Sequence, residues 1–95
     1  MDKIKEGWQG FIDLCLNSPG KKELAPLLDL FLTMEEKASL ATRYLIVQEL
    51  LREQKTQRQI AKELNVSIAK ITRGSNELKR MSPALITYLR SVLGA

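Results

Sequence analysis

Apolar residues in this chain recur at the three- and four-residue spacing of helices, and no stretch alternates polar and apolar residues as a half-buried strand does. A first apolar stripe runs through Trp8, Phe11 and Cys15, and the Asn-Ser-Pro-Gly run at residues 17–20 ends it. We therefore predict an all-α protein of six short helices, of which the first runs from Lys3 to Asn17.

A proline and a capping box delimit the next two helices. Pro26 lacks a backbone N–H and is expected in the first turn of its helix, which predicts a second helix over residues 23–32. Thr33 followed by Glu36 has the spacing of a capping box and starts a third helix. The third helix is apolar around nearly its whole circumference, so we expect two chains to share a core around it.

Three further helix starts follow in the second half of the chain. Thr56 opens a second capping box and a short helix that ends near Leu64, and a turn at residues 65–67 leads to a helix that starts at Ile68. Ser82-Pro83 supplies an N-cap and a first-turn proline for the last helix. No repeat or long linker interrupts the chain, so residues 1–95 are predicted to form a single helical domain.

Residues 56–73 have the pattern of a helix-turn-helix, a motif that places its second helix in the major groove of DNA. Ala61 is small where the two helices would cross, and Asn65 belongs to a residue type that tolerates the left-handed backbone of the turn. The alternative is a plain helical hairpin within a bundle. The apolar residues that would fix the angle between the two helices are Ile60, Leu64, Val66 and Ile71.

Positive charge is concentrated in the same part of the chain. The chain carries 15 Lys and Arg against 11 Asp and Glu, and residues 52–80 hold eight basic and three acidic residues. A basic segment is typical of a domain that contacts a polyanion, although a solvated helix surface can have the same composition. No aromatic residue lies between Leu45 and Ile86, which favours duplex DNA over stacked single strands. The candidate DNA-binding residues are Gln57, Arg58, Lys62, Ile68, Ala69, Lys70, Thr72 and Lys79.

Other residue counts argue against whole classes of function. The chain has no His and a single Cys, which disfavours most enzyme chemistry, an internal disulfide and a metal centre. No apolar run approaches the length of a membrane span, and the N-terminus does not have the pattern of a signal peptide. We expect a cytoplasmic protein that is not an enzyme and has no membrane partner, metal or cofactor.

Two residues do not fit a plain helical bundle. Gly74 lies inside a predicted helix, where glycine costs about 1 kcal/mol relative to alanine, so either a ligand or a crossing helix should approach closely there. Arg43 lies on an apolar flank of the third helix, where its guanidinium needs an anion, an aromatic face or a route to water. A nearby Glu would serve equally well for Arg43.

Several strings of the sequence point to one family. They are the ITRGSN string at residues 71–76, Gln57-Arg58, and the runs at 46–51, 27–33 and 41–43. Together, over about residues 8–93, they resemble the tryptophan repressor family. The resemblance implies an intertwined homodimer in which the corepressor L-tryptophan orients two DNA-binding units. It assigns residues 1–52 to dimerisation core helices, 57–80 to the helix-turn-helix DNA-binding region and 82–93 to a C-terminal dimer helix.

The resemblance also implies a tryptophan site. Arg43 and Arg73 would sandwich the indole, and Arg73 would bind the carboxylate together with Thr33 of the other chain. The backbone carbonyls of Leu30 and Leu32 would accept the ammonium. The remaining residues at this site would be Val47, Gly74 and Glu77.

The chain departs from the family pattern at three positions. Glu77 occupies a position at which the family pattern has a small residue that helps to bind the ligand amino group. The Glu77 carboxylate could pair with the ammonium or point to solvent. Lys70 replaces a small hydroxyl residue on the base-reading face, and Ala61 replaces a lysine that contacts phosphate, with Lys62 one position on.

The leading hypothesis is an L-tryptophan-activated homodimeric repressor that binds operator DNA of tryptophan biosynthesis or uptake genes. The alternative is a constitutive helix-turn-helix protein that tryptophan does not gate, which a blocking Glu77 would favour. An enzyme has little support, because Glu35 and Glu36 are better explained by helix capping and solvated surface.

Overall fold

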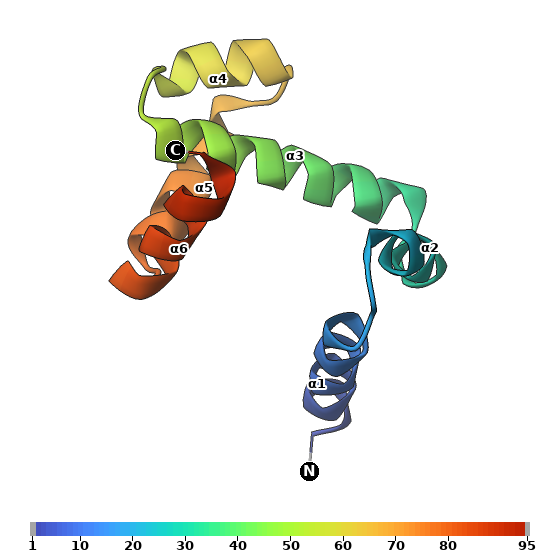
Figure 1. The fold of residues 1–95 in the computed structure, drawn as a ribbon. Coiled ribbons are helices and arrows are strands. Elements are labelled where there is room, and N and C mark those ends of the chain that lie inside the picture. The colour runs from blue at the N-terminus through green and yellow to red at the C-terminus, as the bar shows by residue number, and fades with distance from the viewer. Residues whose placement is uncertain (1, 95) are drawn as a thin grey trace. The chain divides into compact units, whose positions relative to one another are not determined.

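The computed structural model describes residues 2–94, in two compact units that comprise residues 2–37 and 38–94. Each unit is described by itself. The described residues form helices and no strand, which confirms the prediction of an all-α protein with six helices. The helices are α1 Lys3–Leu16, α2 Lys21–Phe31, α3 Met34–Arg52, α4 Gln57–Leu64, α5 Ile68–Lys79 and α6 Pro83–Leu93 (Figure 1).

An aromatic cluster joins α1 to α2 in the first unit. The Phe11 ring lies 6.0 Å from the Trp8 ring and meets the Phe31 ring edge-on, with 5.4 Å between centroids. Edge-to-face and offset contacts at these distances are the favourable geometries for aromatic pairs. Trp8 and Phe31 nevertheless remain 60% and 53% exposed in the single chain. The first unit therefore leaves much of its aromatic surface uncovered.

The prediction that Pro26 lies in the first turn of its helix is wrong. The α2 helix begins at Lys21, which makes Pro26 an interior residue. Gly20 is the N-cap, and its carbonyl accepts the N–H groups of Glu23 and Leu24 at 3.2 and 2.9 Å. Pro26 cannot donate to the carbonyl of Lys22 four residues earlier. The Lys22 position is exposed, so water can satisfy that carbonyl.

The helix starts of the second half are as predicted. The Thr56 hydroxyl accepts the Gln59 N–H at 3.2 Å, and the Gln59 side chain accepts the Thr56 N–H at 2.8 Å, which completes the capping box. Ser67 and Ser82 cap α5 and α6. Asn65 has φ 55° and ψ 48°, the left-handed conformation expected for the turn between α4 and α5.

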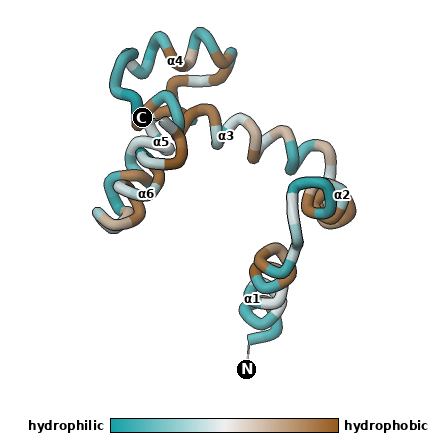
Figure 2. The backbone as a smooth tube through the Cα atoms, in the orientation of Figure 1, coloured by the Kyte–Doolittle hydropathy of each residue, from teal (hydrophilic) through white to brown (hydrophobic). Residues whose placement is uncertain are grey.

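The core of the second unit lies where α3, α4 and α5 meet. Figure 2 shows α4 as a mainly hydrophilic helix, so its few apolar residues decide how it packs. The buried cluster contains Ile46 of α3, Ile60 and Ala61 of α4, and Ile71 of α5. Three partly buried apolar residues pack against this cluster: Leu50, Leu64 and Val66. The apolar residues predicted to fix the angle between α4 and α5 therefore do pack together.

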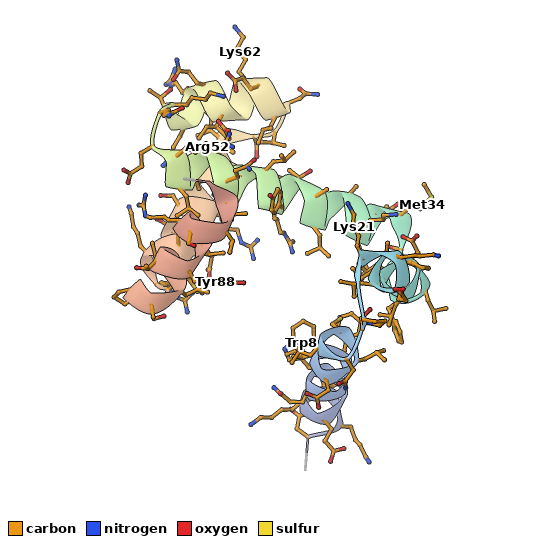
Figure 3. The ribbon with its side chains drawn as sticks, in the orientation of Figure 1. Trp8, Lys21, Met34, Arg52, Lys62 and Tyr88 are labelled. Carbon is orange, nitrogen blue, oxygen red and sulfur yellow. The ribbon has the colours of Figure 1, made fainter. Side chains whose placement is uncertain are left out.

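Apolar side chains of α3 and α6 remain uncovered in the single chain. Leu40, Tyr44 and Leu45 of α3 are 49%, 51% and 41% exposed. Tyr88 of α6, labelled in Figure 3, is 61% exposed. Uncovered apolar surface of this kind marks sites of association. The surface is consistent with the predicted shared core, and the dimer itself stays a prediction. Within residues 2–94, no helix combines the length and apolarity that spanning a bilayer requires.

A candidate ligand groove beside a candidate DNA-binding surface

The second unit contains a groove of about 950 Å³ bordered by α3, α5 and α6. Its volume lies near the upper end of the range for small-molecule sites. Most of its lining is apolar, with cationic side chains contributed by Arg43 of α3 and by Lys70 and Arg73 of α5. The predicted ligand-binding residues that line it are Arg43, Val47, Arg73, Gly74 and Glu77.

The other three predicted ligand residues belong to the first unit. Leu30 lies in the last turn of α2 and Leu32 is its C-cap, where backbone carbonyls lack donors within the helix and attract cations. The Thr33 hydroxyl accepts the Glu36 N–H at 3.0 Å and retains its own proton to donate to a carboxylate. The chemistry of these groups fits the assigned roles, and those roles stay predictions.

The backbone geometry at Gly74 favours a crossing helix over a ligand as the reason for a glycine at this position. An ideal Cβ at this position would lie 3.0 Å from Cγ2 of Ile46 and 3.5 Å from Cδ1 of Leu50. Carbon atoms prefer separations of about 3.5–4.0 Å, so a side chain here would crowd α3. The close crossing of α3 and α5 thus accounts for the glycine. Ligand contact at Gly74 stays a prediction.

The charged residues of the groove are unevenly paired. Glu77 accepts a hydrogen bond from Arg80 at 3.1 Å, a partner that the sequence interpretation missed although the spacing of three residues is visible. Within residues 2–94, no ion pair is found for Arg43 or Arg73. Two guanidinium groups therefore border the groove without an ion pair to a carboxylate of the described chain. Such groups can bind a carboxylate and can stack on an aromatic ring.

The N-terminal end of α5, which the sequence predicts to read bases, is exposed. Ile68 is 45% exposed, and Ala69, Lys70 and Thr72 are also exposed. The Thr72 hydroxyl donates to Oε1 of Gln57 at 2.9 Å and so connects α5 to α4. The Gln57 amide keeps its N–H donors, which suit a phosphate oxygen, while the Thr72 oxygen keeps its acceptor capacity.

Ion pairs leave a net positive surface on this part of the chain. All three acidic residues between 52 and 80 are paired: Glu53 with Arg90, Glu63 with Lys55, and Glu77 with Arg80. Figure 3 shows Lys62 pointing away from α3 into open space. Five cations of the segment have no ion pair within the described chain: Arg58, Lys62, Lys70, Arg73 and Lys79.

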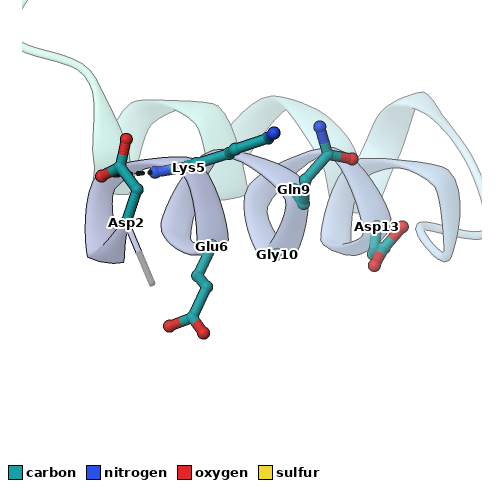
Figure 4. Close-up of a pocket in the computed structure, with 6 residues that line it drawn as sticks. All are labelled: Asp2, Lys5, Glu6, Gln9, Gly10 and Asp13. Atoms are coloured by element: carbon teal, nitrogen blue, oxygen red, sulfur yellow. Dashed lines mark hydrogen bonds between the residues drawn. The ribbon is translucent and has the colours of Figure 1, made fainter.

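A second depression lies along the polar face of α1 (Figure 4). It is lined by Asp2, Lys5, Glu6, Gln9, Gly10 and Asp13, all from one helix and its N-cap. A single helix face cannot enclose a ligand, and none of the predicted site residues lines this depression.

Residues 2–94 also contain no cluster of His, Cys, Asp and Glu suited to a metal ion.

Comparison with known proteins shows the family of the chain. The chain matches the family described as Trp repressor protein over residues 6–93. A Trp operon repressor homolog from Chlamydia caviae is 46% identical over 88 residues, which cover 93% of this chain and 87% of that protein. A homolog of the same name from Chlamydia trachomatis serovar D is 44% identical over 86 residues, which cover 90% of this chain and 92% of the relative.

The similarity extends beyond these two organisms. A Trp operon repressor homolog from Vibrio vulnificus is 47% identical over 75 residues, which cover 79% of this chain and 74% of that protein. These relatives support a transcriptional repressor and not an enzyme. The chain belongs to the Trp repressor family.

Proposed function

We propose that this protein is an L-tryptophan-activated repressor that binds operator DNA of tryptophan biosynthesis or uptake genes as a homodimer. One observation carries the proposal: α5 contributes both to the groove and to the exposed end predicted to enter DNA. Lys70 and Arg73 line the groove, and Lys70 also belongs to the predicted base-reading face. A ligand held against Arg73 therefore contacts the helix that reads the DNA.

The groove suits a flat aromatic amino acid. Its apolar walls favour an indole ring, and the unpaired guanidinium groups of Arg43 and Arg73 can stack on it or bind its carboxylate. Glu77 can receive the ammonium if the ligand displaces Arg80 from it. These features support tryptophan over an uncharged aromatic molecule.

Gating would follow from a shift in population. A ligand that binds one arrangement of the two DNA-binding units more tightly increases the share of molecules in that arrangement. The uncovered side chains of Leu40, Tyr44 and Tyr88 supply the apolar surface that a second copy of the chain would cover. A dimer would then place two α5 helices on successive major grooves. A cytoplasmic location would follow from this role.

The alternative is a constitutive DNA-binding protein, and the presence of Glu77 in the groove favours it. A carboxylate at this position could repel the ligand carboxylate and leave the groove empty. The two functions differ in one measurable respect, because only the repressor changes its DNA affinity with tryptophan.

Calorimetric titration with L-tryptophan tests the ligand without knowledge of the operator. We expect saturable binding of one tryptophan per chain, weaker binding of indole-3-propionate and tryptamine, and none of L-phenylalanine. Arg43→Leu and Arg73→Leu should abolish the heat. Lys79→Met, which removes a charge on the same helix outside the groove, should retain it.

Selection from a random duplex library, with and without tryptophan, tests the DNA-binding half of the proposal. Enrichment of one motif only with tryptophan would support the repressor. The same enrichment in both conditions would support the constitutive alternative, and no enrichment in either would contradict both.

A further inference from the structure

The α4 helix is attached to α3 at two separate points. The first is apolar, because Ile60 and Ala61 are buried against Ile46. The second is ionic: Nζ of Lys55, in the connection between α3 and α4, lies 2.8 Å from Oε2 of Glu49 and 2.6 Å from Oε2 of Glu63. The apolar contact holds α4 against α3 and, through Ile71, against α5. The ionic contact gives α4 a second attachment to α3, separate from the apolar one.

The ionic contact is partly shielded from water. The Glu49 side chain is only 14% exposed and the Lys55 side chain 34%, whereas Glu63 is 53% exposed. The hydrogen bond and charge of Lys55, helped by Arg52, lower the pKa of Glu49 against the opposing effect of desolvation. Hydrogen bonds to Glu49 and Glu63 raise the pKa of Lys55. Glu49 and Lys55 therefore stay charged at neutral pH.

The beginning of the same connection is held from α6. Arg90 donates to the backbone carbonyl of Leu51 at 3.0 Å and lies 3.5 Å from Oε1 of Glu53. Glu53 itself has φ 55°, a left-handed conformation that non-glycine residues seldom adopt. Arg90 thus holds the first residues of the connection, and Lys55 holds its last part, next to the capping box of α4.

We propose that Lys55 is a positioning residue for DNA binding: by bridging Glu49 and Glu63 it holds α4 at the angle from which α5 meets the major groove, and it does not contact DNA itself. The proposal rests on the proposed function. The hydrogen bond between Gln57 of α4 and Thr72 of α5 links the position of α4 to that of the predicted base-reading end of α5. Two of the three Lys55 donors already have carboxylate partners, and the two carboxylates outweigh the single positive charge of Lys55, which disfavours a phosphate there.

Charge neutralisation and positioning predict different salt dependences. A lysine that contacts phosphate contributes to the slope of log affinity against log salt concentration, and its loss lowers that slope by about 0.9. A positioning residue changes affinity and leaves the slope as it is. We therefore compare Lys55→Met with Lys62→Met, which removes the same charge from an exposed lysine without an ion pair in the described chain.

Affinity for the selected duplex is measured by fluorescence anisotropy between 50 and 300 mM salt, roughly the range in which such slopes are resolved. We expect Lys55→Met to weaken binding about fivefold with an unchanged slope. Lys62→Met should reduce the slope by about 1. Lys55→Arg should restore affinity, since a guanidinium can also bridge two carboxylates.

Glu63→Gln gives an independent test with the opposite electrostatic sign. This variant makes the protein more positive, so long-range electrostatics predicts tighter DNA binding. Loss of positioning predicts weaker binding. Weaker binding supports the proposal, whereas tighter binding, or a reduced slope in Lys55→Met, overturns it.

Hydrogen exchange separates failure of this proposal from failure of the proposed function. Without DNA, the amides of residues 60–64 should exchange faster in Lys55→Met than in the parent, and at the parent rate in Lys62→Met. Unchanged exchange in Lys55→Met overturns the positioning role. A parent protein that binds no duplex overturns the proposed function, while the exchange comparison still decides the role of Lys55.

Discussion

Replacing Gly74 with alanine has two opposite effects on the free energy of unfolding. Alanine in a helix interior is favoured over glycine by about 1 kcal/mol. Against this gain stands a Cβ only 3.0 Å from Cγ2 of Ile46 and 3.5 Å from Cδ1 of Leu50. Overpacking of this kind typically costs about 1–3 kcal/mol.

The crowding should outweigh the gain in helix propensity because Ile46 cannot move aside. Ile46 is 4% exposed, and a β-branched side chain in a helix has essentially one χ1 rotamer. We expect Gly74→Ala to lower the free energy of unfolding by about 1 kcal/mol, the difference between the two terms. Gly10→Ala is the matched control, since nothing lies within 4 Å of its Cβ on the polar face of α1 (Figure 4). It should raise stability by up to about 1 kcal/mol.

Urea denaturation followed by circular dichroism, at one fixed protein concentration, measures both variants. A double-mutant cycle with Ile46→Leu, which removes Cγ2 at constant volume, should show favourable coupling between the two substitutions. If Gly74→Ala stabilises the protein as much as Gly10→Ala, the explanation by helix crossing is wrong. Loss of tryptophan binding with stability retained would instead indicate that a ligand needs this space.

Three further outcomes follow from the second unit. Asn65 has φ 55°, so Asn65→Ala should lower the free energy of unfolding by about 1 kcal/mol and Asn65→Gly should change it little; a larger loss with glycine would contradict this reasoning. Ile71 is 0% exposed, and Ile71→Ala should cost about 2–5 kcal/mol in thermal or urea unfolding, against less than 1 kcal/mol if the site were surface-like. Lys55 keeps the pKa of Glu49 below 4.5, so their interaction stabilises the fold above that pH and is lost as the pH falls through the lowered pKa. The unfolding free energy of Glu49→Gln should accordingly fall less steeply than that of the parent as the pH drops below 4.5.

Helix starts were predictable because the interactions that make them are local. Thr56 and Gln59 lie three residues apart, and their mutual capping depends on nothing elsewhere in the chain. Asn65 likewise indicates a left-handed turn by its residue type. The N-cap of α2 is Gly20, which has no side chain that could indicate a helix start. The sequence pattern therefore predicted a later start for α2 and placed Pro26 wrongly in its first turn.

The sequence by itself determined the fold class and the α4–turn–α5 arrangement, because helical periodicity and capping operate within a few residues. The candidate tryptophan-site residues came from the family resemblance and not from these local patterns. Only the tertiary structure decided that Ile46 accounts for Gly74 and that Lys55 bridges Glu49 and Glu63. These contacts depend on the angles at which helices cross and on side chains brought together across a connection. Such angles follow from the packing of the whole unit, and short-range sequence patterns do not predict that packing.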